Sequence, residues 1–386
     1  MAERALKRSD EAAALDWIDR STWLSGADAE SDLLRARVYR RQGRMNDVAD
    51  ALRVAERHGA RRTRIRDEQI LAMAQSGQMR DAEPHLARLL MDPDADSIDV
   101  SRTFALGYIR TQRYEPAAKL LESWAADAPH DDEPRLIRGR LRLLQRNLNE
   151  ADVWLRAALE IDPKNPETLL EMGHLMTSLN RQAEAATWYE QVLSHPRLGP
   201  EAAVGYASCL RSEGQSPRAA EVLREVLARH PDNVAMIREL GGLESELGRR
   251  EEAIRLLERG AELAPYDAET RYLLAQAYRQ AGRYDDARPH LEFHQQARLA
   301  LTELNYLNDT LRTNPRDVTA LARSGELMLQ FAEPDEGVVR LLTALDVEPS
   351  NAVARRLLAE HYAAKAATDP SYRSLAEQFR LPAESP

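Results

Sequence analysis

The sequence contains 386 residues, carries a formal net charge of −10, and is 43% hydrophobic, 30% charged and only 5% aromatic. This net charge argues against general nucleic-acid binding, which requires a basic face, and the chain is too apolar to be disordered. The single cysteine, Cys209, excludes an internal disulfide and a cysteine-cluster metal site. No stretch is long and apolar enough to predict a membrane span or a signal peptide. The abundance of Ala, Leu, Glu and Arg predicts an all-helical protein.

Small residues and prolines recur with a single period of 34 residues. One column of small residues consists of Ala105, Gly139, Gly173, Ala207, Gly241 and Ala275. A second column consists of Ala117, Ala151, Ala185, Ala219, Ala253 and Ala287. The proline column consists of Pro129, Pro163, Pro231 and Pro265, with Pro196 one residue early. Three columns with one period predict an array of internal repeats.

This pattern resembles the tetratricopeptide repeat, a helix–turn–helix unit that is small at its eighth and twentieth positions and ends near a proline. The unit that begins at Val234 matches best, with Gly241, Gly248, Ala253 and Pro265 at the characteristic positions. The small residues allow the two helices of a unit to pack closely, and proline ends the second helix. The resemblance implies an all-α fold, a right-handed superhelical α-solenoid of stacked repeats.

In chain order, residues 1–28 are predicted to be a partial repeat. Residues 12–18 read as a second helix of a unit, with Ser9 or Asp10 as its cap. The chain would then open inside a repeat, either because this half-repeat is a natural cap or because a longer protein has been trimmed. An array at 29–301 follows, with units at 29–62, 63–97, 98–131, 132–165, 166–199, 200–233, 234–267 and 268–301.

An insertion of 16 residues follows Ala287, because the next small residue in that column is Gly337 rather than residue 321. Apolar residues recur through it at helical spacing, and they are Ala297, Leu301, Leu304, Leu307 and Leu311. One long helix is therefore predicted from about Asp285 to about Thr313, with Pro289 in its first turns.

Two interpretations of the insertion stay open. It is either a spacer that resets the superhelix, as the apolar spacing favours, or a protruding helix that binds a partner or a second copy. A further repeat is predicted at 318–351, and capping helices with a tail are predicted at 352–386.

No arrangement of residues predicts catalysis, a cofactor or a metal site. His290 and His294 share a helical face, but Glu292 lies between them, where it does not make the zinc-protease motif. Cys209 reads as a small buried residue, without a base beside it in the sequence. The sequence therefore predicts a protein that is not an enzyme and that needs no cofactor.

The resemblance to tetratricopeptide repeats implies a ligand groove along the first helix of each unit. Carried over by register, the candidate groove residues are Arg37, Arg102, Arg140, His174, Ser208, Arg211, Arg238, Tyr272, Gln276 and Arg279. Arginine suits carboxylate or phosphate groups. The residues expected to add apolar area are Leu136, Leu170, Val204 and Tyr272. The Lys/Asn set of chaperone-tail clamps and the Asn ladder of sugar-transferase repeats are missing, so neither partner is implied.

The sequence thus predicts a non-enzymatic scaffold that binds a peptide or partner protein, with acidic groups, in this groove. One alternative is a binding module trimmed from a larger membrane-anchored or exported protein. Another is a structural solenoid that self-assembles into a homo-oligomer. The default location is cytoplasmic, and a truncated N-terminus would instead indicate a periplasmic or membrane-tethered protein.

Overall fold

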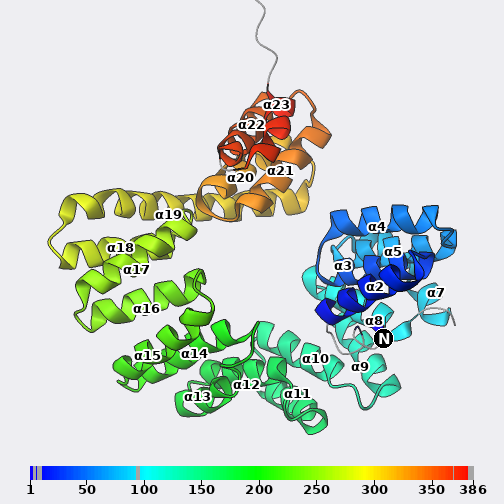
Figure 1. Ribbon diagram of the computed structural model, residues 1–386, viewed down its shortest axis with the longest axis horizontal. Coiled ribbons are helices and arrows are strands. Elements are labelled where there is room, and N and C mark those ends of the chain that lie inside the picture. The colour runs from blue at the N-terminus through cyan, green and yellow to red at the C-terminus, as the bar shows by residue number, and fades with distance from the viewer. Residues whose placement is uncertain (3–5, 7–10, 93–95, 368, 381–386) are drawn as a thin grey trace, which may run out of the picture. The chain divides into compact units, whose positions relative to one another are not determined.

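The computed structural model describes residues 1–2, 6, 11–92, 96–367 and 369–380. Every regular element in these ranges is a helix, and successive helices form antiparallel pairs (Figure 1), so the predicted all-α fold of stacked helix–turn–helix repeats is confirmed. The chain divides into two compact units, residues 1–181 and 182–386, which are described separately below. The predicted cap at Ser9 or Asp10 and the tail at 381–386 lie outside the described residues.

The first complete helix described in the first unit is α2, which packs on α3, and helical hairpins follow. Its second hairpin is irregular, because Pro84 interrupts the second helix and splits it into α6, the 3-10 turn η1 and α7. The elements of this unit are α2 (Glu11–Ser25), α3 (Ala29–Arg41), α4 (Met45–Arg57), α5 (Arg62–Gln75), α6 (Met79–Ala82), η1 (Glu83–His85), α7 (Leu86–Met91), α8 (Ser97–Arg110), α9 (Tyr114–Asp127), α10 (Glu133–Leu144), α11 (Leu148–Ile161) and α12 (Pro166–Ser178).

The second unit contains three complete hairpins, a long-helix repeat and a helical end. α16 and α17 form one regular hairpin, visible in Figure 1. The elements of this unit are α13 (Gln182–Glu190), α14 (Gly199–Ser212), α15 (Ser216–Arg229), α16 (Val234–Glu246), α17 (Arg250–Leu263), α18 (Ala268–Gln280), α19 (Tyr284–Thr313), α20 (Val318–Phe331), α21 (Pro334–Val347), α22 (Ala352–Ala366), η2 (Pro370–Tyr372) and α23 (Arg373–Phe379).

Five first helices, α12, α16, α18, α20 and α22, are preceded by a proline that is followed two residues later by an aspartate or asparagine. The capping residues accept hydrogen bonds from backbone N–H groups of the first helical turn, and they are Asn165, Asn233, Asp267, Asp317 and Asn351. Proline cannot continue the preceding helix, and the Asx side chain satisfies an N–H group that would otherwise lack a partner. This short sequence pattern therefore ends one repeat and starts the next.

The turn inside eight of the hairpins contains one residue in the left-handed region, whereas the α20–α21 turn contains none. Glycine holds this position in five repeats, with φ between 74° and 84°, and these residues are Gly43, Gly77, Gly214, Gly248 and Gly282. Gln112, Arg146 and Asn180 hold it in three consecutive repeats, with φ of 58° or 59°. A left-handed residue after a helix lets its last carbonyls find partners. Only glycine adopts this conformation without a steric penalty.

The small-residue columns lie where the two helices of a hairpin touch. A Cβ atom added at Gly241 would lie 2.6 Å from Cγ of Leu257, which is fully buried on the facing helix. The same distance separates such an atom at Gly139 from Cδ2 of Leu155. These contacts confirm the close helix approach that the small residues predict.

The inserted residues lengthen α19, which has 30 residues and is about 45 Å long. Ala300, Leu304 and Leu307 in its second half are buried in one apolar cluster with residues of α20, α21 and α22. Leu301 was expected to share this stripe but is 48% exposed, because it lies on the flank of the helix rather than toward α20. Pro289 is the sixth residue of α19 and so lies beyond the first turn, where proline is best tolerated.

The end of the second unit is covered by α22 and α23. Phe379 on α23 stacks on Tyr362 of α22, with ring centroids 5.9 Å apart, and joins the apolar cluster around α20. None of the helices in the described part of the chain is long and apolar enough to cross a membrane.

Candidate functional site

The candidate groove of the first unit begins with three arginines on α3 that contact acids on α5 and α8. Arg40 is fully buried, pairs with Asp99 of α8, and lies 3.1 Å from Oε2 of Glu68 on α5. Arg37 lies 3.2 Å from Oε1 of Glu68, and Arg41 lies 2.8 Å from Oδ1 of Asp99. One polar network therefore ties three successive first helices together.

Asp99 is the centre of this network. Burial raises the pKa of a carboxyl group, but the guanidinium groups of Arg40, Arg37 and Arg41 outweigh it and hold the pKa of Asp99 well below its usual range. Asp99 is therefore a buried carboxylate surrounded by cations. The role of Arg37 here is to hold acids of its own chain.

The next candidates along the first unit are also paired with acids of the following helix. Arg102 on α8 binds Glu133 at the start of α10. Arg140 on α10 lies 2.7 Å from Oε1 of Glu171 and 3.1 Å from Oε2 of Glu167, both on α12. His174 lies one turn after Glu171, with Nδ1 3.5 Å from Oε2 of that carboxylate.

Two arginines of the second unit follow the same rule. Arg211 on α14 lies 2.9 Å from Glu239 on α16, and Arg238 on α16 lies 2.7 Å from Asp267, the cap of α18. Burial raises the pKa of Glu239, and Arg211 opposes this rise only in part. The arginine therefore offsets only part of the cost of burying this carboxylate. The neighbouring candidate Ser208 is half-buried on α14.

The last three candidates share one helix, α18, and differ from the rest. Tyr272 is half-buried and stacks on His294 of α19, with ring centroids 4.7 Å apart. Gln276 is half-buried and Arg279 is exposed. Neither of these two side chains has a hydrogen-bond or ion-pair partner among the described residues. Arg279 is thus the one candidate arginine without an acid partner among the described residues.

The acids that pair with the arginines were missed by the sequence interpretation. Their signal is a regular spacing of 31 residues, as in Arg37–Glu68, Arg102–Glu133 and Arg140–Glu171. This spacing is three residues shorter than the 34-residue repeat. The acid therefore lies about one helical turn closer to the start of its first helix than the arginine does on the preceding first helix. Searching for Arg and Glu at that interval would have identified these three pairs, but not Arg211–Glu239 and Arg238–Asp267, which are 28 and 29 residues apart.

Leu136 and Leu170 were expected to add apolar area to the groove, and this expectation is wrong. Both are buried, with 2% and 3% of their surface exposed. They therefore belong to the packing between helices, because their position on the first helix turns toward the neighbouring helix and not toward solvent.

The described residues contain no group of three or more His, Cys, Asp or Glu placed to hold a metal ion. Nδ1 of His294 lies 3.2 Å from the carbonyl oxygen of Ala268, and His290 lies against Tyr278 and Arg271. Cys209 is fully buried on α14. These side chains serve helix packing.

Comparison with known families identifies the repeats. Two tetratricopeptide-repeat family models match residues 178–234, 210–265 and 244–292. No curated protein matches the sequence. The matched stretches lie within the array predicted at 29–301, and the predicted family is confirmed.

Solved structures with a similar arrangement of helices share little sequence with this chain. PilW, a widely conserved type IV pilus biogenesis factor, is 22% identical; the match covers 50% of this chain and 90% of that one, with a TM-score of 0.46. The protein pilF of Pseudomonas aeruginosa is 17% identical; the match covers 61% of this chain and 99% of that one, with a TM-score of 0.40. YrrB, a TPR protein with an unusual peptide-binding site, is 15% identical; the match covers 62% of this chain and 98% of that one, with a TM-score of 0.37.

Proposed function

We propose that this tetratricopeptide-repeat protein is a non-enzymatic scaffold that binds acidic peptide segments along α18 in its second unit. Its repeats support a role in protein–protein interaction in general. The observation that carries the finer proposal is the contrast between Arg279 and the arginines before it. Arg211 and Arg238 are occupied by carboxylates of this chain, whereas Arg279 is exposed and has none among the described residues.

Three different side chains follow one face of α18. Tyr272, Gln276 and Arg279 are spaced by four and then three residues, which places them in one line along the helix. The guanidinium group suits a carboxylate in bidentate fashion. The Gln276 amide both donates and accepts hydrogen bonds, as a peptide backbone requires. The Tyr272 ring, stacked on His294, offers apolar surface.

The spacing of this line limits the peptide. Tyr272 and Arg279 are seven residues apart, about 10 Å along a helix, and an extended peptide covers that length in about three residues. The preferred ligand therefore carries an Asp or Glu about three residues from an apolar side chain. A phosphorylated residue is a weaker candidate, because it would find only one unpaired guanidinium group at this place.

An array of matched peptides tests the proposal. Each acidic peptide with an apolar residue three positions away is paired with its Gln or Asn counterpart, and binding to the full chain is measured by fluorescence anisotropy. The acidic members should bind more tightly, and Arg279→Gln should weaken them about tenfold, the size of a lost charge-assisted hydrogen bond. Raised salt should reduce the same difference.

Arg298→Gln is the control for this variant, because Arg298 is an exposed arginine of the same unit on α19, also without an ion-pair partner among the described residues. It removes the same charge from the unit but not from α18. Equal weakening by the two variants, or no preference for acidic peptides, would overturn the role of Arg279.

Self-assembly through α19 is a second candidate function. Leu299 and Tyr306 lie two turns apart on one face of this helix and are 67% and 73% exposed. Light scattering across a concentration range tests it. We expect association that is lost in Leu299→Glu, and a monomer at every concentration would exclude it.

A further inference from the structure

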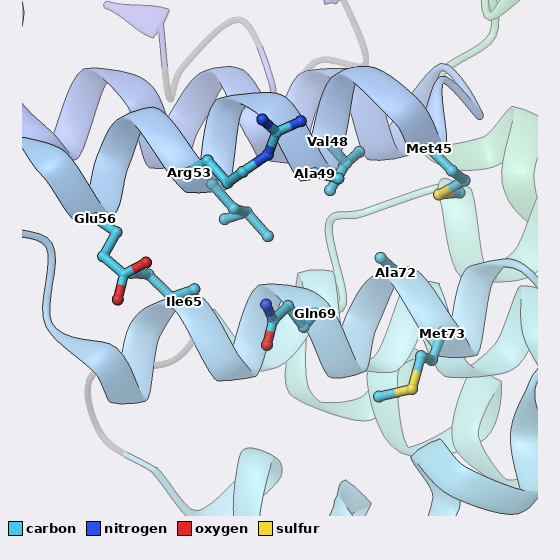
Figure 2. Close-up of a pocket in the computed structure, with 10 residues that line it drawn as sticks. Met45, Val48, Ala49, Arg53, Glu56, Ile65, Gln69, Ala72 and Met73 are labelled. Atoms are coloured by element: carbon cyan, nitrogen blue, oxygen red, sulfur yellow. The ribbon is translucent and has the colours of Figure 1, made fainter.

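An apolar groove lies on the first unit, away from the arginine pairs of α3, α8, α10 and α12. It has a volume of about 400 Å³ and is lined by residues of α4 and α5 (Figure 2), which are Met45, Val48, Ala49, Leu52, Arg53, Glu56, Ile65, Gln69, Ala72 and Met73. Val48, Leu52 and Ile65 are buried and form its floor, while Ala49 and Gln69 are exposed on its rim. None of the lining residues comes from α6 or α7, the two pieces of the helix that Pro84 interrupts.

The two ends of the groove differ in chemistry. Met45 and Met73 lie at one end, and Glu56 and Ile65 lie at the other (Figure 2). Unbranched thioether side chains adapt to irregular apolar partners. The first end is thus apolar and adaptable, whereas the second end leads toward the turn between α4 and α5.

Arginines continue the groove beyond that second end. Arg57 lies one turn after Arg53 on α4, and Arg62 lies one turn before Ile65 and Arg66 on α5, so these arginines extend the two lining faces. Arg57, Arg62 and Arg66 are exposed, and none has an ion-pair partner among the described residues. Glu56 is the one carboxylate that lines the groove.

The start of α5 makes this end more positive. Arg61 is its N-cap residue, makes no side-chain cap hydrogen bond, and no acid lies in the first turn. Cations at a helix N-terminus oppose the helix dipole, and the first N–H groups stay without the Asx partner found in other repeats. An incoming carboxylate would relieve both effects.

We propose that this groove is a docking site for an amphipathic helix of a partner protein, with its apolar face in the groove and its acidic end beside Arg57, Arg62 and Arg66. The groove follows α4 from Met45 to Glu56, about 16 Å, which is three turns of a docked helix and room for apolar side chains at i, i+4 and i+7.

The surroundings favour a helix over other occupants. The walls are helices whose backbone groups are bonded within the helix, so an extended strand would find no backbone partners there, whereas a helix satisfies its own. No aromatic side chain lines the groove, so nucleic-acid bases would find no stacking surface. The cluster of unpaired arginines complements an acidic helix and repels a basic one.

Selection from a displayed library of random helical peptides tests the proposal with the full chain. Peptides are first selected for binding to the unaltered protein, and those that also bind the Ala49→Glu variant are then removed. This substitution puts a charge on the exposed rim of the groove without filling the core. The surviving peptides should share apolar residues at i, i+4 and i+7 and a cluster of Asp or Glu at one end. Their affinity should fall at least about tenfold in Ala49→Glu.

Two further variants make the result specific. The double variant Arg62→Gln with Arg66→Gln should weaken acidic peptides about fivefold, as expected for two solvent-exposed charge pairs, and should leave their Gln-substituted versions unchanged. Ala126→Glu, at an exposed alanine of α9, is the control and should change nothing. Circular dichroism spectra confirm that each variant keeps its helices.

Three results would overturn the proposal. Ala49→Glu weakens the binding of no selected peptide, the selected peptides show no acidic end, or vesicles of phosphatidylglycerol bind the unaltered protein and bind Ala49→Glu more weakly. The last result would assign the groove to an anionic lipid surface. Because these variants lie in the first unit and Arg279 lies in the second, failure here leaves the proposed peptide binding along α18 untouched, and the reverse also holds.

Discussion

The left-handed turn residue found in eight of the hairpins permits a stability prediction with an internal control. Arg146 has φ of 59° and is exposed, and its side chain makes no hydrogen bond or ion pair among the described residues. The left-handed conformation costs a non-glycine residue about 1–2 kcal/mol. Glycine avoids this penalty but loses about 0.5–1 kcal/mol more backbone entropy on folding. Arg146→Gly should therefore stabilise the α10–α11 hairpin by about 0.5–1 kcal/mol.

Native-state hydrogen exchange of the α10 and α11 amides is the appropriate assay, because repeat arrays open locally and need not unfold in one step. The expected gain raises their protection factors about two- to fivefold. Arg146→Ala is the matched control. It removes the same side chain but keeps a Cβ atom in the left-handed conformation, so it should give no gain.

The reciprocal change should have the opposite sign. A Cβ atom at Gly248 would meet no atom within 4 Å, so Gly248→Ala adds no clash with neighbouring atoms and tests the backbone alone. It should destabilise the α16–α17 hairpin by about 1 kcal/mol. Equal protection in Arg146→Gly and Arg146→Ala would refute the reasoning, because the φ angle would then have no energetic consequence.

Three further predictions concern buried and strained groups. Asp99→Asn should destabilise the first unit by about 3–5 kcal/mol in urea unfolding, because Arg40 would stay buried beside a neutral partner, whereas Asp50→Asn at an exposed pair should change little. Burial, and to a lesser extent Arg271, lowers the pKa of His290 from its usual 6.5. The contribution of His290 to stability is therefore complete above pH 6.5 and falls as the pH drops. His290→Gln should reduce this pH dependence in thermal melts. Pro289→Ala should stabilise the start of α19, measured by hydrogen exchange, because it restores a backbone N–H donor inside the helix.

Much of the fold follows from short-range features of the sequence. The prolines and small residues locate the repeats because each type has one physical role, which is to end a helix or to permit close packing. The absence of turn residues after Leu291 predicts a long helix ending near Thr313, and α19 ends at that residue. The break of the second hairpin at Pro84 was not predicted, because proline in a short helix leads to several different local structures.

The groove was harder to predict than the fold. Periodicity identifies which face a residue occupies, but it does not reveal how far one helix is shifted along the next. That shift decides whether Arg140 meets Glu171 or solvent, and whether Leu136 is buried. The same limit explains why the α4–α5 groove was missed, because it depends on the packing of two particular helices and on no motif.

The unpaired arginines of the two proposed sites lie beside interruptions of the repeat. The 31-residue spacing that supplies an acid to Arg140 would supply residue 310 to Arg279, and this residue is Thr310 on α19. The 16-residue insertion moves the equivalent acid to Glu326, which is bound to Arg323 at 2.8 Å. The insertion thus displaces in the sequence the acid that the 31-residue spacing would supply, and Arg279 has no acid partner among the described residues. The second proposed site also lies beside an irregularity. Its arginines lie on the facing helices of the α3–α4 hairpin and the next hairpin, whose second helix is broken by Pro84, and they are Arg57, Arg62 and Arg66. At both proposed sites, arginines beside an irregularity of the array have no acid partner among the described residues and are available to a binding partner.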